Sequence, residues 1–342
     1  MRIISSADLH LQSIQNEIKT IIQEGGLIVF PTETVYGIGA DATNPNAVKK
    51  IFIAKGRPSD NPLIVHLADQ KDLESVVTSV PDLAYQLMNK FWPGPLTMVF
   101  HKKEIIPKEV SGGLSTVGIR IPSSHAAQAV IKAAGVPICA PSANLSGKPS
   151  STLFKHVLED FNEKVDMIID GGQVDIGLES TVIDMTTPIP ILLRPGAITK
   201  EMIEETLGIG IMDATKDEIK DIPKAPGMKY THYAPKGKVY LIDGTKEAVI
   251  SYINLALEQY DEHQVGVIAP SEYQEELKGF YKVNLGSLDN FEEIGRNIFL
   301  ALRQMDALNI NHIFIPALPT HDLGQAIMNR LLKAAGQHLI HV

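Results

Sequence analysis

Apolar residues recur at helical spacing near the N-terminus and then give way to an uninterrupted apolar stretch. Residues 11–23 place isoleucines on one helical face, and the pair Gly25-Gly26 follows as a stop signal. Residues 27–30 are all apolar, which is typical of a strand that is buried on both faces. We therefore expect a helix that leads directly into a central strand.

The same patterns continue through the first 206 residues. Further strands are expected at 63–67, 97–101, 116–121, 138–140, 167–170, 181–184 and 191–193. Further helices are expected near 47–54, 83–91, 126–134, 153–159 and 200–206. Strands and helices follow one another without strict alternation, so the pattern predicts an α/β domain with a twisted mixed sheet and packed helices.

The pattern changes at residues 207–237, where prolines punctuate the chain but tyrosines, a methionine and a histidine are interspersed. From residue 238 onward, strands alternate with helices. The expected strands are 239–242, 265–269, 281–284 and 312–315, and the expected helices are 246–258, 272–277, 290–308 and 323–335. We predict a domain at 1–206, a linker at 207–237, and a small Rossmann-like α/β domain at 238–342.

Composition narrows the class of protein. The 342 residues are 44% hydrophobic and 21% charged, which is typical of a globular chain. The net charge of -9 argues against a protein that coats nucleic acid non-specifically. No apolar run reaches ~18 residues, the N-terminus lacks a signal-peptide core, and Cys139 is the only cysteine. We expect a cytoplasmic protein without membrane contact or disulfides, and a buried, unreactive Cys139.

The richest candidate chemistry lies at residues 55–63, between a predicted helix and a predicted strand. Lys55 and Arg57 stand there in a loop shaped by a glycine and two prolines. A point charge and a bidentate guanidinium suit a polyphosphate. A solvated charged loop is the alternative.

Residues 31–42 contain G-x-G-x-x-A after a strand, but the glycines come too late for a dinucleotide-binding turn. No acidic strand end follows at the required distance, and the chain has no P-loop motif. What remains is a hydroxyl-rich loop with Thr32, Thr34 and Tyr36. These hydroxyls either bind a ligand at a strand end or satisfy the backbone of a turn.

Arg120 interrupts an otherwise apolar strand, and a buried arginine requires a carboxylate from the protein, the commoner case, or from a ligand. Residues 140–151 form a second polar loop, rich in serine and containing Lys148, and Arg194 ends another strand. We find no convincing catalytic triad, no paired cysteines and no zinc-ligand spacing. The scattered cations at strand ends suit an anionic ligand that carries phosphates and a carboxylate.

Taken together, these segments resemble the Sua5/YrdC/YwlC family, the threonylcarbamoyl-AMP synthases. The matching segments are 31–44, 53–67, 91–97, 115–122, 137–151, 177–184 and 193–198. The linker and the following domain resemble the longer, Sua5-type members. The resemblance implies that L-threonine, bicarbonate and ATP give threonylcarbamoyl-AMP and pyrophosphate. The product would serve the threonylcarbamoyl modification of tRNA adenosine 37 through a separate transferase complex, with possible direct tRNA contact.

The resemblance also implies a set of site residues. L-threonine would be bound by Thr34, His66, Arg120, Ala140 and Ser180. ATP would be bound by Lys55, Arg57, Asn61, Thr116, Ser142, Ser150, Arg194 and the linker residue Tyr233. Lys55 and Arg57 would be the catalytic cations, the linker would act as a lid, and Mg²⁺ would enter with ATP without protein ligands.

Two other readings stay open at this point. One is the carbamoyl-adenylate-forming part of hydrogenase maturation proteins, although a single cysteine cannot supply the zinc fingers that those proteins contain. The other is an RNA-binding or ribosome-assembly module that uses the same sheet. Its base-stacking aromatic residues are missing from the polar loops, which hold hydroxyl groups instead.

Overall fold

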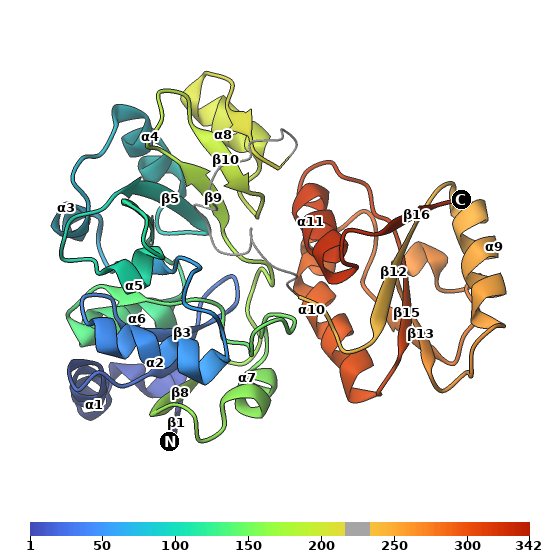
Figure 1. Ribbon diagram of the computed structural model, residues 1–342, viewed down its shortest axis with the longest axis horizontal. Coiled ribbons are helices and arrows are strands. Elements are labelled where there is room, and N and C mark those ends of the chain that lie inside the picture. The colour runs from blue at the N-terminus through green and yellow to red at the C-terminus, as the bar shows by residue number, and fades with distance from the viewer. Residues whose placement is uncertain (216–232) are drawn as a thin grey trace. The chain divides into compact units, whose positions relative to one another are not determined.

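The computed structural model describes residues 1–215 and 233–342, which divide into two compact units (Figure 1). The first unit contains Met1–Ser146, Ser151–Asp175 and the described residues from Glu179 to Thr215. The second contains the described residues from Tyr233 to Val342, together with Gly147–Ser150 and Ile176–Leu178. Two short segments of the N-terminal sequence therefore belong to the second unit.

The first unit contains eleven strands in one sheet. They are β1 (Arg2–Ser5), β2 (Ile28–Pro31), β3 (Tyr36–Asp41), β4 (Ile64–His66), β5 (Leu96–His101), β6 (Thr116–Arg120), β7 (Ile138–Cys139), β8 (Met167–Asp170), β9 (Thr181–Asp184), β10 (Ile191–Arg194) and β11 (Met212–Asp213). Its helices are α1 (Gln12–Gln23), α2 (Pro45–Lys55), α3 (Leu73–Val76), α4 (Asp82–Phe91), α5 (Lys108–Ser111), α6 (His125–Ala134), α7 (Phe154–Phe161) and α8 (Lys200–Leu207), with short 3₁₀ turns at Ser6–His10 and Gln70–Asp72.

The strand order is β1-β8-β2-β3-β7-β4-β6-β5-β9-β10-β11. The sheet contains parallel pairs, such as β4 with β6, and antiparallel pairs, such as β5 with β6. The prediction of a mixed sheet with packed helices is therefore confirmed.

Both faces of this sheet are buried, which explains the uninterrupted apolar strands. In β2, Val29 faces the cluster formed with α2, α4 and α8, whereas Ile28 and Phe30 face α1 and α6. This alternation follows from the two-residue period of a strand. Cys139 is buried in the same core, and burial raises the pKa of its thiol, so this cysteine is unreactive.

The prediction of a loop through residues 36–41 is wrong, because β3 pairs there with β2 and β7. β3 contains Gly37 and Gly39, and glycine is uncommon in strands, so the sequence pattern does not predict a strand there. A Cβ atom on Gly39 would lie 2.6 Å from the ring of Phe30, so the close approach of β2 requires glycine. Glycine is therefore required at this position of β3 by packing against β2.

The second unit has a five-stranded, fully parallel sheet in the order β14-β13-β15-β12-β16. The strands are β12 (Lys238–Asp243), β13 (Val265–Ala269), β14 (Tyr281–Asn284), β15 (His312–Pro316) and β16 (Leu339–His341). The helices are α9 (Lys246–Leu257), α10 (Phe291–Ala307) and α11 (Gly324–Ala334), and Figure 1 shows α9 on the opposite side of the sheet from α10 and α11. This layering confirms the Rossmann-like α/β prediction, although the helix expected at 272–277 is only a 3₁₀ turn at Ser271–Tyr273.

The predicted lid, residues 207–237, lies largely outside the described residues. At its start, α8 packs against α4, and β11 pairs with β10. Residues 207–215 are thus part of the first unit. Whether the remainder folds over a site stays a prediction.

Candidate active site

Arg120 lies at the end of β6, opposite His66 of β4, and only 3% of its surface is exposed. Its Nε donates to the Gly94 carbonyl at 3.2 Å, and its Nη1 donates to Thr34 Oγ1 at 2.9 Å. Its Nη2 lies 2.6 Å from Oε1 of Glu33, which is 5% exposed. The carboxylate that the buried arginine requires therefore comes from the protein, the commoner of the two cases considered from the sequence.

The electrostatics of this cluster fix its protonation. Burial, reinforced by the charge of Arg120, lowers the pKa of His66 to about 3, so its imidazole is neutral. Burial alone would raise the pKa of Glu33, but the charge of Arg120 and the hydrogen bonds to the carboxylate together outweigh burial and hold that pKa below its ordinary value. Nδ1 of His66 has no hydrogen-bond partner within residues 1–215 and 233–342. A buried, unpartnered ring nitrogen is a feature of a ligand site.

The hydroxyls of Thr32, Thr34 and Tyr36, for which ligand binding and turn stabilisation were both open, differ in their contacts, and only that of Thr34 touches Arg120. Thr32 Oγ1 donates to the Val35 carbonyl at 2.6 Å and accepts the N–H groups of Thr34 and Val35, so it stabilises the turn. The Tyr36 hydroxyl donates to the Gly172 carbonyl at 2.9 Å. Thr34 alone accepts from the guanidinium.

A second arginine, Arg194, ends β10, which is separated from β6 in the sheet by β5 and β9. Nε and Nη2 of Arg194 donate to the Ser180 carbonyl at 3.0 and 2.8 Å, and the Ser180 hydroxyl lies 2.8 Å from Thr97 Oγ1. All three side chains are buried. The contact orients the guanidinium of Arg194 through a backbone carbonyl.

Lys55, at the end of α2, shapes the loop after β7. Its ammonium group donates to the carbonyls of Ser142 and, at 2.6 Å, of Asn144. The Ser142 hydroxyl donates to Oδ1 of Asn144 at 2.7 Å, and the N–H of Ser146 returns to the Lys55 carbonyl at 2.9 Å. Lys55 therefore holds the polar loop in shape, whereas its contact with phosphate stays a prediction.

Asn61 lies in the loop after α2 and is 1% exposed. Neither atom of its amide has a hydrogen-bond partner among the residues that the structure describes. Burial of an unpaired amide costs roughly 1–3 kcal/mol, so this amide is expected to serve a ligand. Arg57, four residues earlier, is half-buried beside a left-handed glycine that ends α2.

The first unit contains most of the predicted site residues. These are Thr34, Lys55, Arg57, Asn61, His66, Thr116, Arg120, Ala140, Ser142, Ser180 and Arg194. Ser150 and Tyr233 belong to the second unit, where the ring of Tyr233 packs on Phe299 at 5.1 Å and Arg303 donates to the Pro149 carbonyl at 2.7 Å. The structure leaves the ligand roles of all these residues as predictions.

Sequence reasoning missed two members of the clusters. The sequence pattern assigns no role to Glu33, although it is the acidic residue nearest to Thr34 in the chain. It predicts Thr97 only as part of a strand. A search for the carboxylate that Arg120 requires could have selected Glu33, but only the fold brings the two side chains together.

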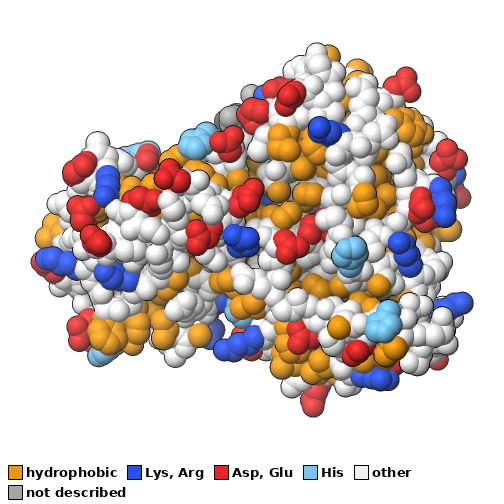
Figure 2. All heavy atoms as spheres, turned by 180° about the vertical axis from the view of Figure 1, so that it is seen from behind, with side chains coloured by type: hydrophobic (Ala, Val, Ile, Leu, Met, Phe, Trp, Pro, Cys, Tyr) orange, Lys and Arg blue, Asp and Glu red, His pale blue; other side chains and the backbone are white. Residues whose placement is uncertain are grey.

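Other features of the described residues limit the possibilities. They contain no group of three or more histidine, cysteine, aspartate or glutamate side chains that could hold a metal ion. No helix within residues 1–215 or 233–342 is long and apolar enough to cross a bilayer. On the face shown in Figure 2, acidic and basic side chains are interspersed. Such mixing differs from the basic stripe of a typical nucleic-acid interface.

Two family models match the chain. The Sua5/YciO/YrdC model, described as "Telomere recombination", matches residues 20–196. The model described as the C-terminal domain of threonylcarbamoyl-AMP synthase matches residues 198–336.

Known proteins similar to the chain agree with these models. It is 48% identical over 324 residues to the threonylcarbamoyl-AMP synthase of Pyrococcus abyssi, covering 94% of each chain. It is 43% identical over 323 residues to that of Bacillus subtilis, covering 94% of this chain and 92% of the relative. The crystal structure of P. abyssi Sua5 complexed with L-threonine superposes with a TM-score of 0.91 at 43% identity, covering 100% of both chains.

Proposed function

The chain belongs to the Sua5/YciO/YrdC family, and from that premise we propose that it is a threonylcarbamoyl-AMP synthase. It combines L-threonine, bicarbonate and ATP into threonylcarbamoyl-AMP and releases pyrophosphate. The extent of its similarity to proteins with this name, over 94% of the chain, supports the proposal.

The observation that carries the proposal is the buried cluster around Arg120. A guanidinium, the Thr34 hydroxyl and a neutral imidazole converge there, and Nδ1 of that imidazole has no partner among the described residues. Together they match the carboxylate and the hydrogen-bonding groups of a small amino acid. The P. abyssi protein was crystallised with L-threonine, which supports the same ligand class for this chain.

The nucleotide would lie beside the amino acid. Arg57, Asn61, Arg194 and the loop held by Lys55 supply cations, an open amide and hydroxyl groups. These groups suit the phosphates and the sugar of ATP. Ser150 and Tyr233 would add contacts, as the family resemblance implies.

The reaction needs no covalent bond to the enzyme. The amine of threonine takes up carbon dioxide from bicarbonate as a carbamate, a carbamate oxygen attacks the α-phosphate, and pyrophosphate leaves. The chain would hold the two anions in line, exclude water from the labile carbamate and stabilise the charge that develops on pyrophosphate. The neutral His66 would add no repulsive charge near the amine.

Mg²⁺ would enter bound to the phosphates of ATP. A hydrated Mg²⁺ that is held by phosphate oxygens needs no cage of protein ligands, so no side chain is assigned to it. The metal would neutralise charge on the leaving group.

The product would pass to a transferase that modifies tRNA, so we place the enzyme in the cytoplasm with its tRNA-directed partner. The alternative of a passive RNA-binding module is not favoured, since the relatives that match nearly the whole chain are synthases. Filter binding of tRNA in the absence of ATP tests that alternative directly.

The test of the proposal mixes the purified full chain with ATP, Mg²⁺, L-threonine and ¹³C-labelled bicarbonate. Mass spectrometry should find threonylcarbamoyl-AMP that carries the label, with pyrophosphate in equal amount. Omission of threonine or bicarbonate should abolish both products. Pyrophosphate release without a labelled adenylate would reject the proposed reaction.

A matched pair of arginine variants tests the site. Arg120→Ala should raise the threonine concentration for half-maximal rate about tenfold to hundredfold, because a charge-assisted hydrogen bond contributes roughly 1.5–3 kcal/mol. Arg2→Ala is the control, since that exposed arginine pairs with Glu17 at the surface. An unchanged threonine requirement in Arg120→Ala would remove this arginine from the threonine site.

A further inference from the structure

Glu33 contacts the guanidinium that the proposed function assigns to the carboxylate of threonine. The two side chains are 2.6 Å apart and both nearly fully buried. The family resemblance gave Glu33 no role. Its position therefore requires an explanation beyond the proposed site.

A second carboxylate could not join this pair without cost. Three of the five N–H donors of Arg120 face Gly94, Thr34 and Glu33, so two remain for a ligand, and the cost of a second carboxylate is electrostatic. Two buried anions on one guanidinium would repel each other strongly at low dielectric. An arriving amino acid must therefore compete with Glu33 for Arg120.

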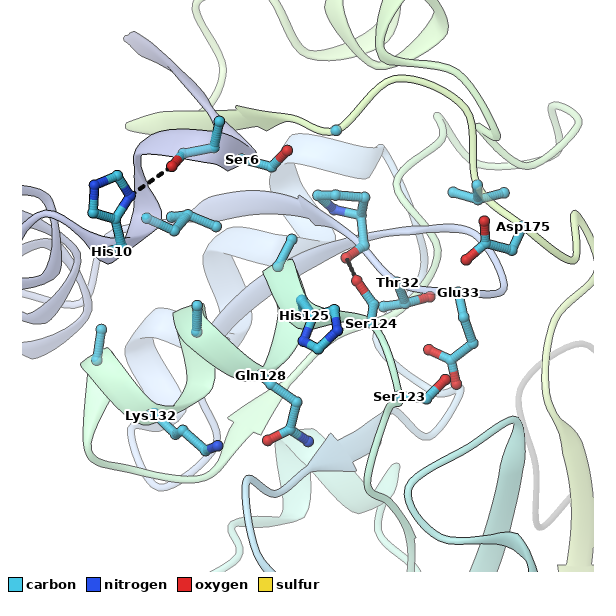
Figure 3. A pocket seen from close by; sticks show the side chains of 18 of the residues that line it. Ser6, His10, Thr32, Glu33, Ser123, Ser124, His125, Gln128, Lys132 and Asp175 are labelled. Atoms are coloured by element: carbon cyan, nitrogen blue, oxygen red, sulfur yellow. Dashed lines mark hydrogen bonds between the residues drawn. The ribbon is translucent and has the colours of Figure 1, made fainter.

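A cavity lined by Glu33 offers space for its carboxylate, and Arg120 is not among the residues that line it. This polar cavity has a volume of about 980 Å³, and Thr32, Ser123 and Ser124 also line it (Figure 3). The backbone N–H of Ser123 already helps to stabilise the charged form of Glu33. Ser124 caps the N-terminus of α6, where partial positive charge favours an anion.

We propose that Glu33 is a positioning residue that holds Arg120 in the empty enzyme and moves into this cavity when the substrate carboxylate binds. Arg120 then never stays buried without an anionic partner. The guanidinium is kept in its binding orientation between turnovers, and only a ligand with a carboxylate can release Glu33. This inference rests on the proposed function for the identity of the amino acid.

A different role for Glu33 makes the opposite prediction. If Glu33 stayed in place and bound the ammonium group of threonine, its removal would weaken threonine binding. Displacement instead predicts that removal strengthens binding, because the competitor for Arg120 is gone. The cavity beside Glu33 favours displacement.

Calorimetry of L-threonine binding to the full chain separates these roles. Glu33→Gln should tighten threonine binding about tenfold, equivalent to about 1.4 kcal/mol, and leave ATP binding unchanged. Asp175→Asn is the matched control, because it removes a carboxylate that lines the same cavity and is exposed. Unchanged or weaker threonine binding in Glu33→Gln would overturn the inference.

Two further measurements make the result specific. Threoninol, which lacks the carboxylate, should gain nothing from Glu33→Gln. Ser123→Asp would place an anion in the path of the displaced Glu33 carboxylate. When Glu33 is present, this substitution should weaken threonine binding several-fold. In the Glu33→Gln background it should weaken threonine binding less than twofold. Equal weakening in both backgrounds would refute movement into the cavity.

The outcomes also separate this inference from the proposed function. Failure of the wild-type chain to form a labelled adenylate would reject the function, whatever Glu33 does. Product formation without tighter binding in Glu33→Gln would reject only the inference. Glu33→Asp is the substitute variant if Glu33→Gln does not fold. Its shorter side chain weakens the ion pair with Arg120, so it should tighten threonine binding at least twofold. Unchanged threonine binding in this variant would refute displacement.

Discussion

Replacement of His66 with glutamine is expected to remove a large part of the acid sensitivity of the first unit. The folded unit keeps this imidazole neutral, with its pKa lowered to about 3 by burial and by the charge of Arg120. The unfolded chain binds a proton at the same residue below pH of about 6.5. Its contribution to stability is therefore complete above that pH and is lost as the pH falls toward the folded pKa.

The expected size follows from this difference in pKa. Each pH unit between the two values costs about 1.4 kcal/mol, so the wild type should lose about 1.4 kcal/mol through His66 between roughly pH 7.5 and 5.5. Glu33 contributes little in this window, because the pKa of its buried carboxyl group lies below its ordinary value. His66→Gln should lack this loss.

Urea unfolding followed by tryptophan fluorescence can measure the effect on the first unit alone. Trp92 is the only tryptophan of the chain, and its indole N–H donates to the Leu96 carbonyl at 2.7 Å within that unit. The exposed His101 offers a control variant, His101→Gln, which should keep the wild-type pH dependence. If His66→Gln and the wild type lost equal stability between the two pH values, the argument from burial would be refuted.

Three further predictions concern the loops and the domain boundary. Lys55→Met should lower the free energy of unfolding of the first unit in urea by roughly 1–3 kcal/mol, because two loop carbonyls lose their donor. The same variant should have a lower turnover but an unchanged affinity for threonine. A free energy of unfolding equal to that of the wild type would contradict this role of Lys55. Asn61→Ala should leave the urea midpoint unchanged or slightly raised, because it removes two buried atoms that have no partner among the described residues. The ATP concentration needed for half-maximal rate should rise. A clear loss of stability would show that the amide is paired. A chain ending at Ile198 should have a lower urea midpoint than one ending at Thr215, because it lacks the buried side chains of α8. Equal midpoints would refute the placement of α8 in this core.

Two predictions concern interactions outside the described structure. The prediction that the linker acts as a lid involves residues 216–232, and the prediction that Mg²⁺ enters with ATP involves bound nucleotide. The synthase assay answers both when it is repeated with Tyr233→Ala and with EDTA. We expect lower turnover in the variant and no product without Mg²⁺.

Elements whose signals are local can be predicted from the amino-acid sequence alone. Helix α1 shows its isoleucine stripe and its glycine stop, and β2 shows the apolar run of a strand buried on both faces. The cations at strand ends could also be read directly. These features need only the period of a helix or strand, which neighbouring residues specify.

Features that depend on residues far apart in the sequence become visible only in the folded structure. Gly39 belongs to a strand because the Phe30 ring occupies the space of its missing side chain. Lys55 shapes a loop far along the chain rather than standing free. Arg120 needed some carboxylate, but only the sheet order and the turn after β2 select Glu33, because a charge is satisfied by proximity in space and not by spacing in sequence.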